Sequence, residues 1–180
     1  MLATLESSIL ELCITMKSEI FQITSEDIQN IAQFAKPIWH EHYSPIIGKN
    51  QVIYMLDKFQ SEKAIKQQLL QGYRYYKVLN EDQLVGYFSI QQRDNSSLFV
   101  SKFYLDKSAR GSGMGRKMLS FIERLANESN CKTIDLTVNK ENPAYEIYLK
   151  LGFKNQGSAE FDIGNGYIMD DYLMSKDIPS

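Results

Sequence analysis

A strand-to-helix turn with three alternate glycines constrains the fold of this chain more than any other segment. The turn lies between Leu105 and Arg116 and has glycines at positions 111, 113 and 115. Glycine lets the backbone turn tightly, and the amides that open the following helix have no acceptor within it. Such amides, aided by the helix dipole, bind pyrophosphate groups. Arg110, Arg116 and Lys117 add cations at the same point, and a turn that binds nothing would need fewer glycines and cations.

Two other phosphate-binding motifs fit this turn less well. A Walker P-loop requires Lys and then Ser or Thr after its last glycine, but Gly115 is followed by Arg116 and Lys117. A dinucleotide-binding turn requires G-x-G-x-x-G in a first βαβ unit, whereas the spacing here is G-x-G-x-G after strands that we expect to be antiparallel. The sequence therefore excludes a nucleotide triphosphatase and leaves dinucleotide binding as a weaker alternative.

The apolar pattern of the first 72 residues predicts one short strand followed by helices. The strand is expected at 19–23, and Ser25 begins a helix that Pro37 ends. An irregular aromatic patch then covers 39–45. Two further helices are expected, at 52–59 and from the capping Ser61 to Gly72.

After Gly72 the hydrophobic period changes from 3.6 to 2, which indicates a sheet. We expect an antiparallel meander, a helix after Gly115, a strand, a helix bracketed by Asn142, Pro143 and Gly152, and two final strands. The predicted strands cover 73–79, 83–91, 97–105, 133–138, 153–163 and 167–176. This order predicts a mixed α/β fold that places the glycine turn at the carboxyl end of a strand, where ligands bind.

The length and the charge limit the other possibilities. A chain of 180 residues has the size of one domain, which we expect at 16–180, after an N-terminal extension at 1–15. Met16 is an alternative start of the ordered domain. The formal net charge of -2 gives no basic field for nucleic acid, and no apolar run suits a signal peptide or a membrane span. We therefore expect a soluble cytoplasmic protein.

The cysteines and histidines do not form a recognisable metal-binding pattern. Cys13 and Cys131 lie far apart and belong to no CxxC or Cys/His spacing. This argues against a disulfide scaffold and against a zinc site, and it favours a reducing compartment. No metal is expected.

Two motifs resemble those of the GNAT superfamily of N-acetyltransferases. The pattern R-x-x-G-x-G, present as Arg110, Gly113 and Gly115, resembles the acyl-CoA pyrophosphate loop of that family. The segment 138–153 is similar to the family's Asn…Ala-x-x-x-Tyr-x-x-x-Gly-Phe stretch, although its loop is one residue shorter than the commonest pattern. The element order is similar over 19–176. The resemblance implies a GNAT-like fold, with a central mixed, mostly antiparallel twisted sheet flanked by helices.

The resemblance also implies an acetyl-CoA site and one catalytic residue. In this family the strand before the glycine turn splays from its neighbour, and its free backbone groups hold the pantetheine arm and the acetyl group. Tyr148 would act as the general acid toward the departing thiolate, or else it is a core tyrosine of its helix. The implied cofactor-binding residues are Phe103, Tyr104, Leu105, Arg110, Gly111, Ser112, Gly113, Met114, Gly115, Arg116, Asn139 and Tyr148.

The acceptor site and the base are less defined by the sequence. Trp39 and Tyr43 would hold a cationic or apolar acceptor through their rings, or they pack between helices. Asp170 and Asp171 lie in a predicted strand, so one faces each side, either on a solvated edge or lining an acidic site. The candidates for the base are His40, Glu41, His42, Asp170 and Asp171.

These features together imply an enzyme that moves the acetyl group of acetyl-CoA to a primary amine of a small molecule, a polyamine-like acceptor included. The transfer would be a direct attack in a ternary complex. An acyl-CoA-binding sensor without activity and an acetyltransferase for protein N-termini or lysines are the alternatives. We expect neither nucleic acid nor membrane as a partner, and a homodimer is common in this family.

Overall fold

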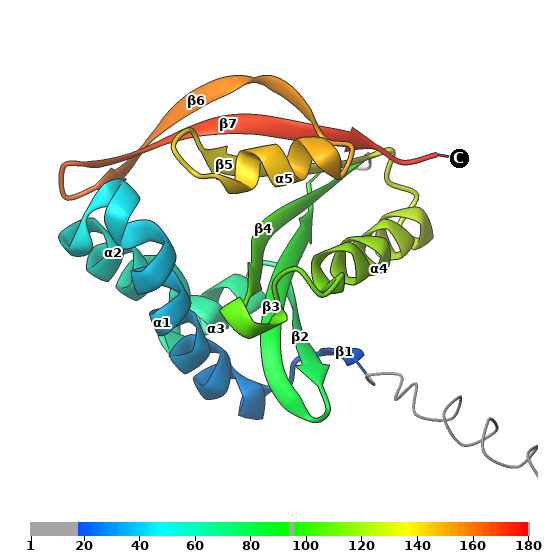
Figure 1. Cartoon of the computed structure of the whole chain (residues 1–180), viewed down its shortest axis with the longest axis horizontal. Helices are drawn as coiled ribbons and strands as arrows, with labels where there is room; N and C mark the ends of the chain where they lie inside the picture. The colour runs from blue at the N-terminus through cyan, green and yellow to red at the C-terminus, as the bar shows by residue number, and fades with distance from the viewer. Residues whose placement is uncertain (1–17, 94–95, 180) are drawn as a thin grey trace, which may run out of the picture.

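The computed structural model describes residues 18–93 and 96–179 (Figure 1). Its centre is a seven-stranded sheet with the order β1-β2-β3-β4-β5-β7-β6. Only β4 and β5 are parallel to each other, and every other neighbouring pair is antiparallel. The strands are β1 (Ser18–Gln22), β2 (Arg74–Asn80), β3 (Gln83–Gln92), β4 (Ser97–Leu105), β5 (Thr133–Asn139), β6 (Lys154–Gly164) and β7 (Tyr167–Asp177).

Helices pack on both faces of this sheet (Figure 1). On one face lie α1 (Ile28–Ile47), α2 (Lys49–Met55) and α3 (Glu62–Leu70), and on the other lie α4 (Met114–Glu128) and α5 (Ala144–Lys150). The expected fold class, a mixed α/β fold with a mostly antiparallel sheet, is confirmed. The predicted extension at 1–15, the alternative start at Met16 and the position of Cys13 lie outside the described residues.

Each face of the sheet has its own hydrophobic core. Tyr76 and Phe88 pack in the cluster that α4 and α5 cover, whereas Tyr75 and Tyr87 pack in the cluster under α1, α2 and α3. Successive side chains of a strand point to opposite faces, so β2 and β3 supply both clusters. This explains why buried side chains follow one another at 75–76 and 85–90, and do not alternate strictly with polar ones.

The first helix is longer than the sequence predicted. Pro37 and Pro45 both lie inside α1, so the predicted end at Pro37 is wrong, and the patch at 39–45 is helical and not irregular. A proline inside a helix removes a hydrogen bond and clashes with the preceding turn. Burial of Ile38 and Trp39, which are each 4% exposed, compensates for this cost.

The other predicted boundaries lie close to the observed ones. The second expected helix is divided into α2 and a π-helical turn at Leu56–Gln60. Ser61 caps α3 by accepting the amide of Ala64 at 3.2 Å. Asn142 caps the turn before α5, because its Oδ1 accepts the amide of Ala144 at 2.8 Å.

The two parallel strands separate partway along the sheet. Residues 97–100 of β4 pair with residues 133–136 of β5, and beyond Val100 and Leu136 each strand pairs only with its other neighbour. The register of β3 on β4 shifts at the same level, since Ile90 pairs with Val100 but Ser89 pairs with Lys102. Ser101 is therefore the extra residue of a β-bulge, which bends a strand. The strands diverge at this bulge.

Candidate active site

The glycine turn forms an open cradle at the start of α4. The first hydrogen bond of the helix runs from Lys117 N to Gly113 O at 3.1 Å, so the amides of residues 114–116 have no acceptor within the helix. Gly111 and Gly113 have φ angles of 77° and 86°, which favour glycine, and a Cβ at either would meet nothing within 4 Å. The free amides and the open space fit a diphosphate group.

The side chains around the cradle have different positions. Met114 is buried, so only its backbone can contribute to the predicted site. The Nε of Arg110 donates to Leu105 O at 3.1 Å, and its guanidinium lies 3.4 Å from Glu41 Oε1. Arg116 is exposed. Lys117 reaches back to Ser18 of β1.

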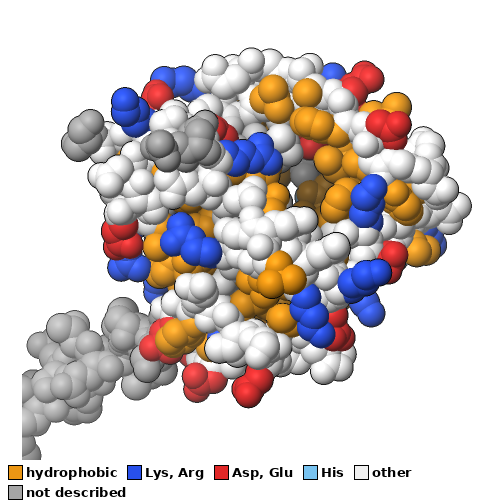
Figure 2. Space-filling model, turned by 180° about the vertical axis from the view of Figure 1, so that it is seen from behind, with side chains coloured by type: hydrophobic (Ala, Val, Ile, Leu, Met, Phe, Trp, Pro, Cys, Tyr) orange, Lys and Arg blue, Asp and Glu red, His pale blue; other side chains and the backbone are white. Residues whose placement is uncertain are grey.

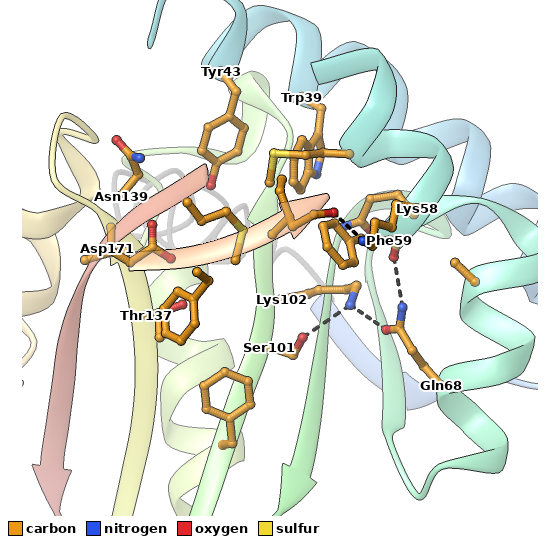
Figure 3. Close-up of a pocket in the computed structure, with 18 of the residues that line it drawn as sticks. Trp39, Tyr43, Lys58, Phe59, Gln68, Ser101, Lys102, Thr137, Asn139 and Asp171 are labelled. Atoms are coloured by element: carbon orange, nitrogen blue, oxygen red, sulfur yellow. Dashed lines mark hydrogen bonds between the residues drawn. The ribbon is translucent and has the colours of Figure 1, made fainter. Parts of the chain in front are cut away.

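On the other face of the sheet, a cavity of about 920 Å³ extends from the gap between β4 and β5 to the helices α1, α2 and α3. The gap itself contributes Ser101, Lys102 and Tyr104 from β4, and Thr137 and Asn139 from β5. The close-up shows these strands around the cavity (Figure 3). The space-filling view from behind shows a hollow surrounded by hydrophobic side chains (Figure 2). The gap therefore opens into the cavity, and β4 continues from the gap to the glycine turn.

Aromatic rings line the wall of the cavity that α1 provides. The ring of Trp39 lies 4.7 Å from that of Tyr43 and 5.7 Å from that of Tyr104. Burial raises the pKa of Tyr43 to about 12 and that of Tyr104 further above its usual value. The predicted substrate residues Trp39 and Tyr43 thus both line the cavity, and they also pack together.

Tyr148 lies on α5, on the side of the gap that carries the cradle. Its ring is 6.3 Å from Phe103 and 5.6 Å from Phe153. The residue as a whole is only half-buried, but protein surrounds its phenol. This burial raises the pKa of Tyr148 well above its usual value, and the nearby Tyr43 adds a smaller effect in the same direction. The phenol therefore stays protonated near neutral pH and can donate a proton.

Asn139 and Asn142 hold the turn between β5 and α5. Asn139 donates to Asp170 O at 3.3 Å and accepts the amide of Glu141 at 3.0 Å, so both ends of its side chain are engaged. Asn142 is buried and donates to the phenol of Tyr43 at 3.4 Å. The two asparagines join α5 to β7 and α1.

The two neighbouring aspartates point in different directions, as the strand pattern predicted. Asp171 is 6% exposed and lines the cavity. Burial raises its pKa, a hydrogen bond with Thr137 opposes this, and Asp170 adds to the rise. Asp170 is not part of the cavity lining and forms an ion pair of 2.5 Å with Lys140.

The other candidate bases lie on α1 outside the cavity lining. His40 and Glu41 are exposed, and Glu41 is paired with Arg110. His42 Nε2 lies 2.9 Å from Asn142 Oδ1. Of the five candidates, Asp171 is therefore the one that lines the cavity.

One charged residue of the site, Lys102, was not predicted from the sequence. Lys102 is 5% exposed and lines the cavity, where its Nζ donates to Gln68 Oε1 at 2.6 Å and to Ser101 Oγ at 3.3 Å (Figure 3). The available signal was a single lysine, the one charged residue of the mostly apolar and aromatic run at 97–105. Strict alternation would have placed it on the face of Val100, and only the bulge at Ser101 moves it to the cavity.

The family model described as an acetyltransferase (GNAT) domain matches residues 45–168. The chain belongs to the GNAT acetyltransferase family. The expected family and the expected class of enzyme, an acyltransferase, are therefore confirmed. Membership of this family supports acetyl-CoA as the co-substrate.

Two curated relatives of this GNAT chain come from Bacillus subtilis. It is 33% identical over 100 residues to a probable spermine N(1)-acetyltransferase of the natto subspecies, and 32% identical over 100 residues to a spermine/spermidine N(1)-acetyltransferase. Each match covers 49% of this chain and 66% of the relative. The matched region thus spans slightly less than two thirds of these relatives.

Solved structures confirm the fold. The structure of the PaiA N-acetyltransferase of Thermoplasma acidophilum in complex with coenzyme A has a TM-score of 0.76 at 18% identity, covering 90% of this chain and 99% of that one. A GCN5-related N-acetyltransferase from Rhodopseudomonas palustris has a TM-score of 0.75 at 15% identity, covering 89% and 96%. At these identities the likeness concerns the fold alone.

The described residues contain neither a helix suited to span a membrane nor a group of side chains suited to bind a metal. No described helix combines the length and the apolar character that a membrane crossing requires. Within residues 18–93 and 96–179, no three His, Cys, Asp or Glu side chains are grouped so that they could hold a metal ion. The cytoplasmic location and the homodimer stay predictions.

Proposed function

We propose that this GNAT chain transfers the acetyl group of acetyl-CoA to a primary amine of a small molecule, by direct attack in a ternary complex. One observation carries the proposal: β4 separates from β5 beyond Val100, lines the cavity there with Lys102 and Tyr104, and then leads into the glycine turn that opens α4. Donor and acceptor would enter from opposite faces and meet between the strands. Direct transfer requires such a meeting point.

The cradle would hold the donor by its diphosphate. The amides of residues 114–116 would bind the phosphate oxygens, and Arg116 would add a positive charge. Acetyl-CoA supplies an acetyl thioester at this site. Beyond Val100, the edge of β4 that faces β5 has no strand partner, so its amides would bind the pantetheine arm and polarise the acetyl carbonyl.

Two side chains would move the protons. Asp171 would take a proton from the attacking amine, directly or through a water molecule, because it is buried in the cavity and its raised pKa makes it a stronger base. Tyr148 would donate its phenol proton to the leaving thiolate from the other side of the gap. Each group lies on the face where its step is expected.

The names of the two relatives suggest polyamines as the first acceptors to test. Asp171 would attract a cationic amine, and Trp39 and Tyr43 would pack against its chain. The acceptor panel should also include amino acids, aminoglycosides and peptides with a free N-terminus or a lysine.

The deciding experiment incubates the protein with acetyl-CoA and this panel and measures the release of free thiol. We expect thiol release that depends on at least one small amine. Binding of acetyl-CoA without release for any amine would support the sensor alternative, and release with peptides alone would support a protein acetyltransferase.

A further inference from the structure

The cavity contains a buried lysine, Lys102, that has no counter-charge among the residues that the structure describes. Lys102 is 5% exposed, and its Nζ donates to Gln68 Oε1 and to Ser101 Oγ, which are both neutral. The ring centroid of Tyr75 lies 5.3 Å from this nitrogen. None of the ion pairs between described residues involves Lys102. An ammonium group has three donors, so the third remains available to a ligand.

The groups that face Lys102 cannot neutralise it. Gln68 comes from α3, Tyr73 and Tyr75 come from the region of β2, and Ser101 precedes the lysine on β4. Gln68 is itself fixed, since its Oε1 also accepts the phenol of Tyr75 at 2.7 Å and its Nε2 donates to Phe59 O at 3.1 Å. Burial alone lowers the pKa of Lys102 to about 7. A ligand with a negative charge would restore its charged form.

The backbone aims this lysine into the cavity. Leu98 and Val100 face the core under α4, and regular alternation would place Lys102 beside them. The bulge at Ser101 changes the alternation, so both Ser101 and Lys102 line the cavity. β-bulges often re-aim a side chain next to an active site.

The other buried charge of the cavity lies on a different strand. The cavity lining contains three basic and two acidic side chains, of which only Lys102 and Asp171 are buried; the five are Lys58, Arg93, Lys102, Asp162 and Asp171. Asp171 is on β7 and Lys102 is on β4, with β5 between them. The two charges do not pair with each other, so the cavity offers a negative wall and a positive wall.

We propose that Lys102 binds a carboxylate of the acceptor, so that the acceptor is an amine that also carries a carboxylate, as an amino acid does. This inference rests on the proposed function and narrows its substrate class. The amine would lie toward Asp171 and the gap, and the carboxylate would accept from the third donor of Lys102 Nζ, on the side of the ammonium away from Gln68 Oε1 and Ser101 Oγ. A polyamine would instead bring a second positive charge toward Lys102, which costs free energy in a buried site.

The test compares amines that differ only in the carboxylate. The kcat/KM of thiol release is measured for lysine and cadaverine, ornithine and putrescine, and phenylalanine and phenethylamine. We expect the carboxylate member to be preferred about 10-fold or more, the usual effect of a charge-assisted hydrogen bond. In Lys102→Met the preference for the carboxylate member should fall about 10-fold, because the KM of that member rises. In Lys102→Arg most of the preference should be retained, because the positive charge is kept. Equal or better use of the decarboxylated amines by the wild type would overturn the inference.

A matched control and a second measurement separate the inference from the proposed function. Lys66→Met on α3 removes an exposed cation paired with Glu62 and should leave the preference unchanged. Binding of pentanoate to the complex with coenzyme A is followed by calorimetry, which requires no turnover. Loss of this binding in Lys102→Met but not in Lys66→Met supports the anion site even if no amine is acetylated, in which case the proposed function alone fails. Equal pentanoate binding by wild type and Lys102→Met, or none by either, contradicts the site.

Discussion

Tyr148 is the residue on which the proposed chemistry most directly depends. Its phenol lies among Phe103, Phe153 and the nearby Tyr43, and burial keeps its pKa high. The raised pKa keeps the phenol protonated, so a donor is present, but it also makes the phenol a weaker acid. Proton transfer from Tyr148 would therefore depend on the negative charge that develops on the leaving sulfur.

Replacing Tyr148 by Phe tests this role. We expect kcat to fall about 100-fold or more, because the leaving thiolate loses its proton donor, while the KM for acetyl-CoA changes little. The control is Tyr145→Phe on the same helix, whose hydroxyl accepts from Asn155 at 3.2 Å and points away from the gap. Wild-type turnover in Tyr148→Phe would remove the acid role.

Lys102, which we propose binds the acceptor carboxylate, should lower the stability of the free protein. Its pKa is lowered from 10.5 to about 7 in the folded state, so the unfolded chain binds more protons between these values and stability rises with pH across this window. The free-energy cost of burying Lys102 is absent above about pH 10.5, where the lysine is neutral in both states, and reaches its full value below about pH 7.

We therefore expect Lys102→Met to raise the free energy of unfolding, by an amount of the order of a few kcal/mol at about pH 6 and less at about pH 9.5. Urea unfolding at the two pH values measures the difference. Gln68 Oε1 keeps the phenol of Tyr75 as a donor in this variant, and Ser101 Oγ, the other acceptor of the lysine, lies on a half-buried residue. An unchanged or lower stability at about pH 6 would show that Lys102 is compensated in the free protein.

The sequence was more informative about some residues than about others. Glycines with positive φ and helix caps such as Ser61 depend on local backbone geometry, so their roles could be read from neighbouring residues. Lys102 and Gln68 are 34 positions apart and meet only in the folded chain. Their pairing depends on the bulge and on the packing of α3, which no local pattern reveals.

At the scale of elements, the glycine turn and α4 form the unit that would hold the donor. Most helices and strands were predictable because both faces of the sheet are covered, and this produces strong apolar patterns. The exception is α1, where Pro37 is a strong local signal against a helix. Burial of Ile38 and Trp39 outweighs that signal. The rule that a proline ends a helix considers only neighbouring residues and does not include the free energy of tertiary packing.

Filling the cradle should abolish donor binding. In Gly113→Trp the indole would occupy the open space beside the amides of α4, and we expect the affinity for coenzyme A to fall about 100-fold or more, measured by calorimetry. Gly166→Trp is a matched control, since Gly166 also has a positive φ, of 75°, and open space, but lies in the turn between β6 and β7. Unchanged affinity in Gly113→Trp would contradict the position of the donor site.

At the scale of the whole molecule, the sheet separates the two regions that we propose for the donor and the acceptor. The cradle and Tyr148 lie with α4 and α5, whereas the cavity lies under α1, α2 and α3. β4 connects the two regions, because it lines the cavity beyond Val100 and then leads into the glycine turn. In the proposed mechanism the two ligands would therefore be bound at once without overlapping.

This arrangement predicts a ternary-complex rate law. Initial rates measured at several fixed amine concentrations should give intersecting double-reciprocal lines, because acetyl transfer requires both ligands together. Cys131, the cysteine within the described chain, is 5% exposed and so is not available as an acetyl carrier. Parallel lines, or an acetylated protein detected by mass spectrometry after incubation with acetyl-CoA alone, would contradict direct transfer.

The extra residue at Ser101 has a consequence for how such an enzyme can change its choice of acceptor. The face on which Lys102 lies depends on the number of residues in β4 and not only on their identity. A deletion or insertion of a single codon at this point would shift the pairing register of the strand, whereas point substitutions leave that register in place. Libraries designed to alter acceptor choice should therefore vary the length of this strand as well as its composition.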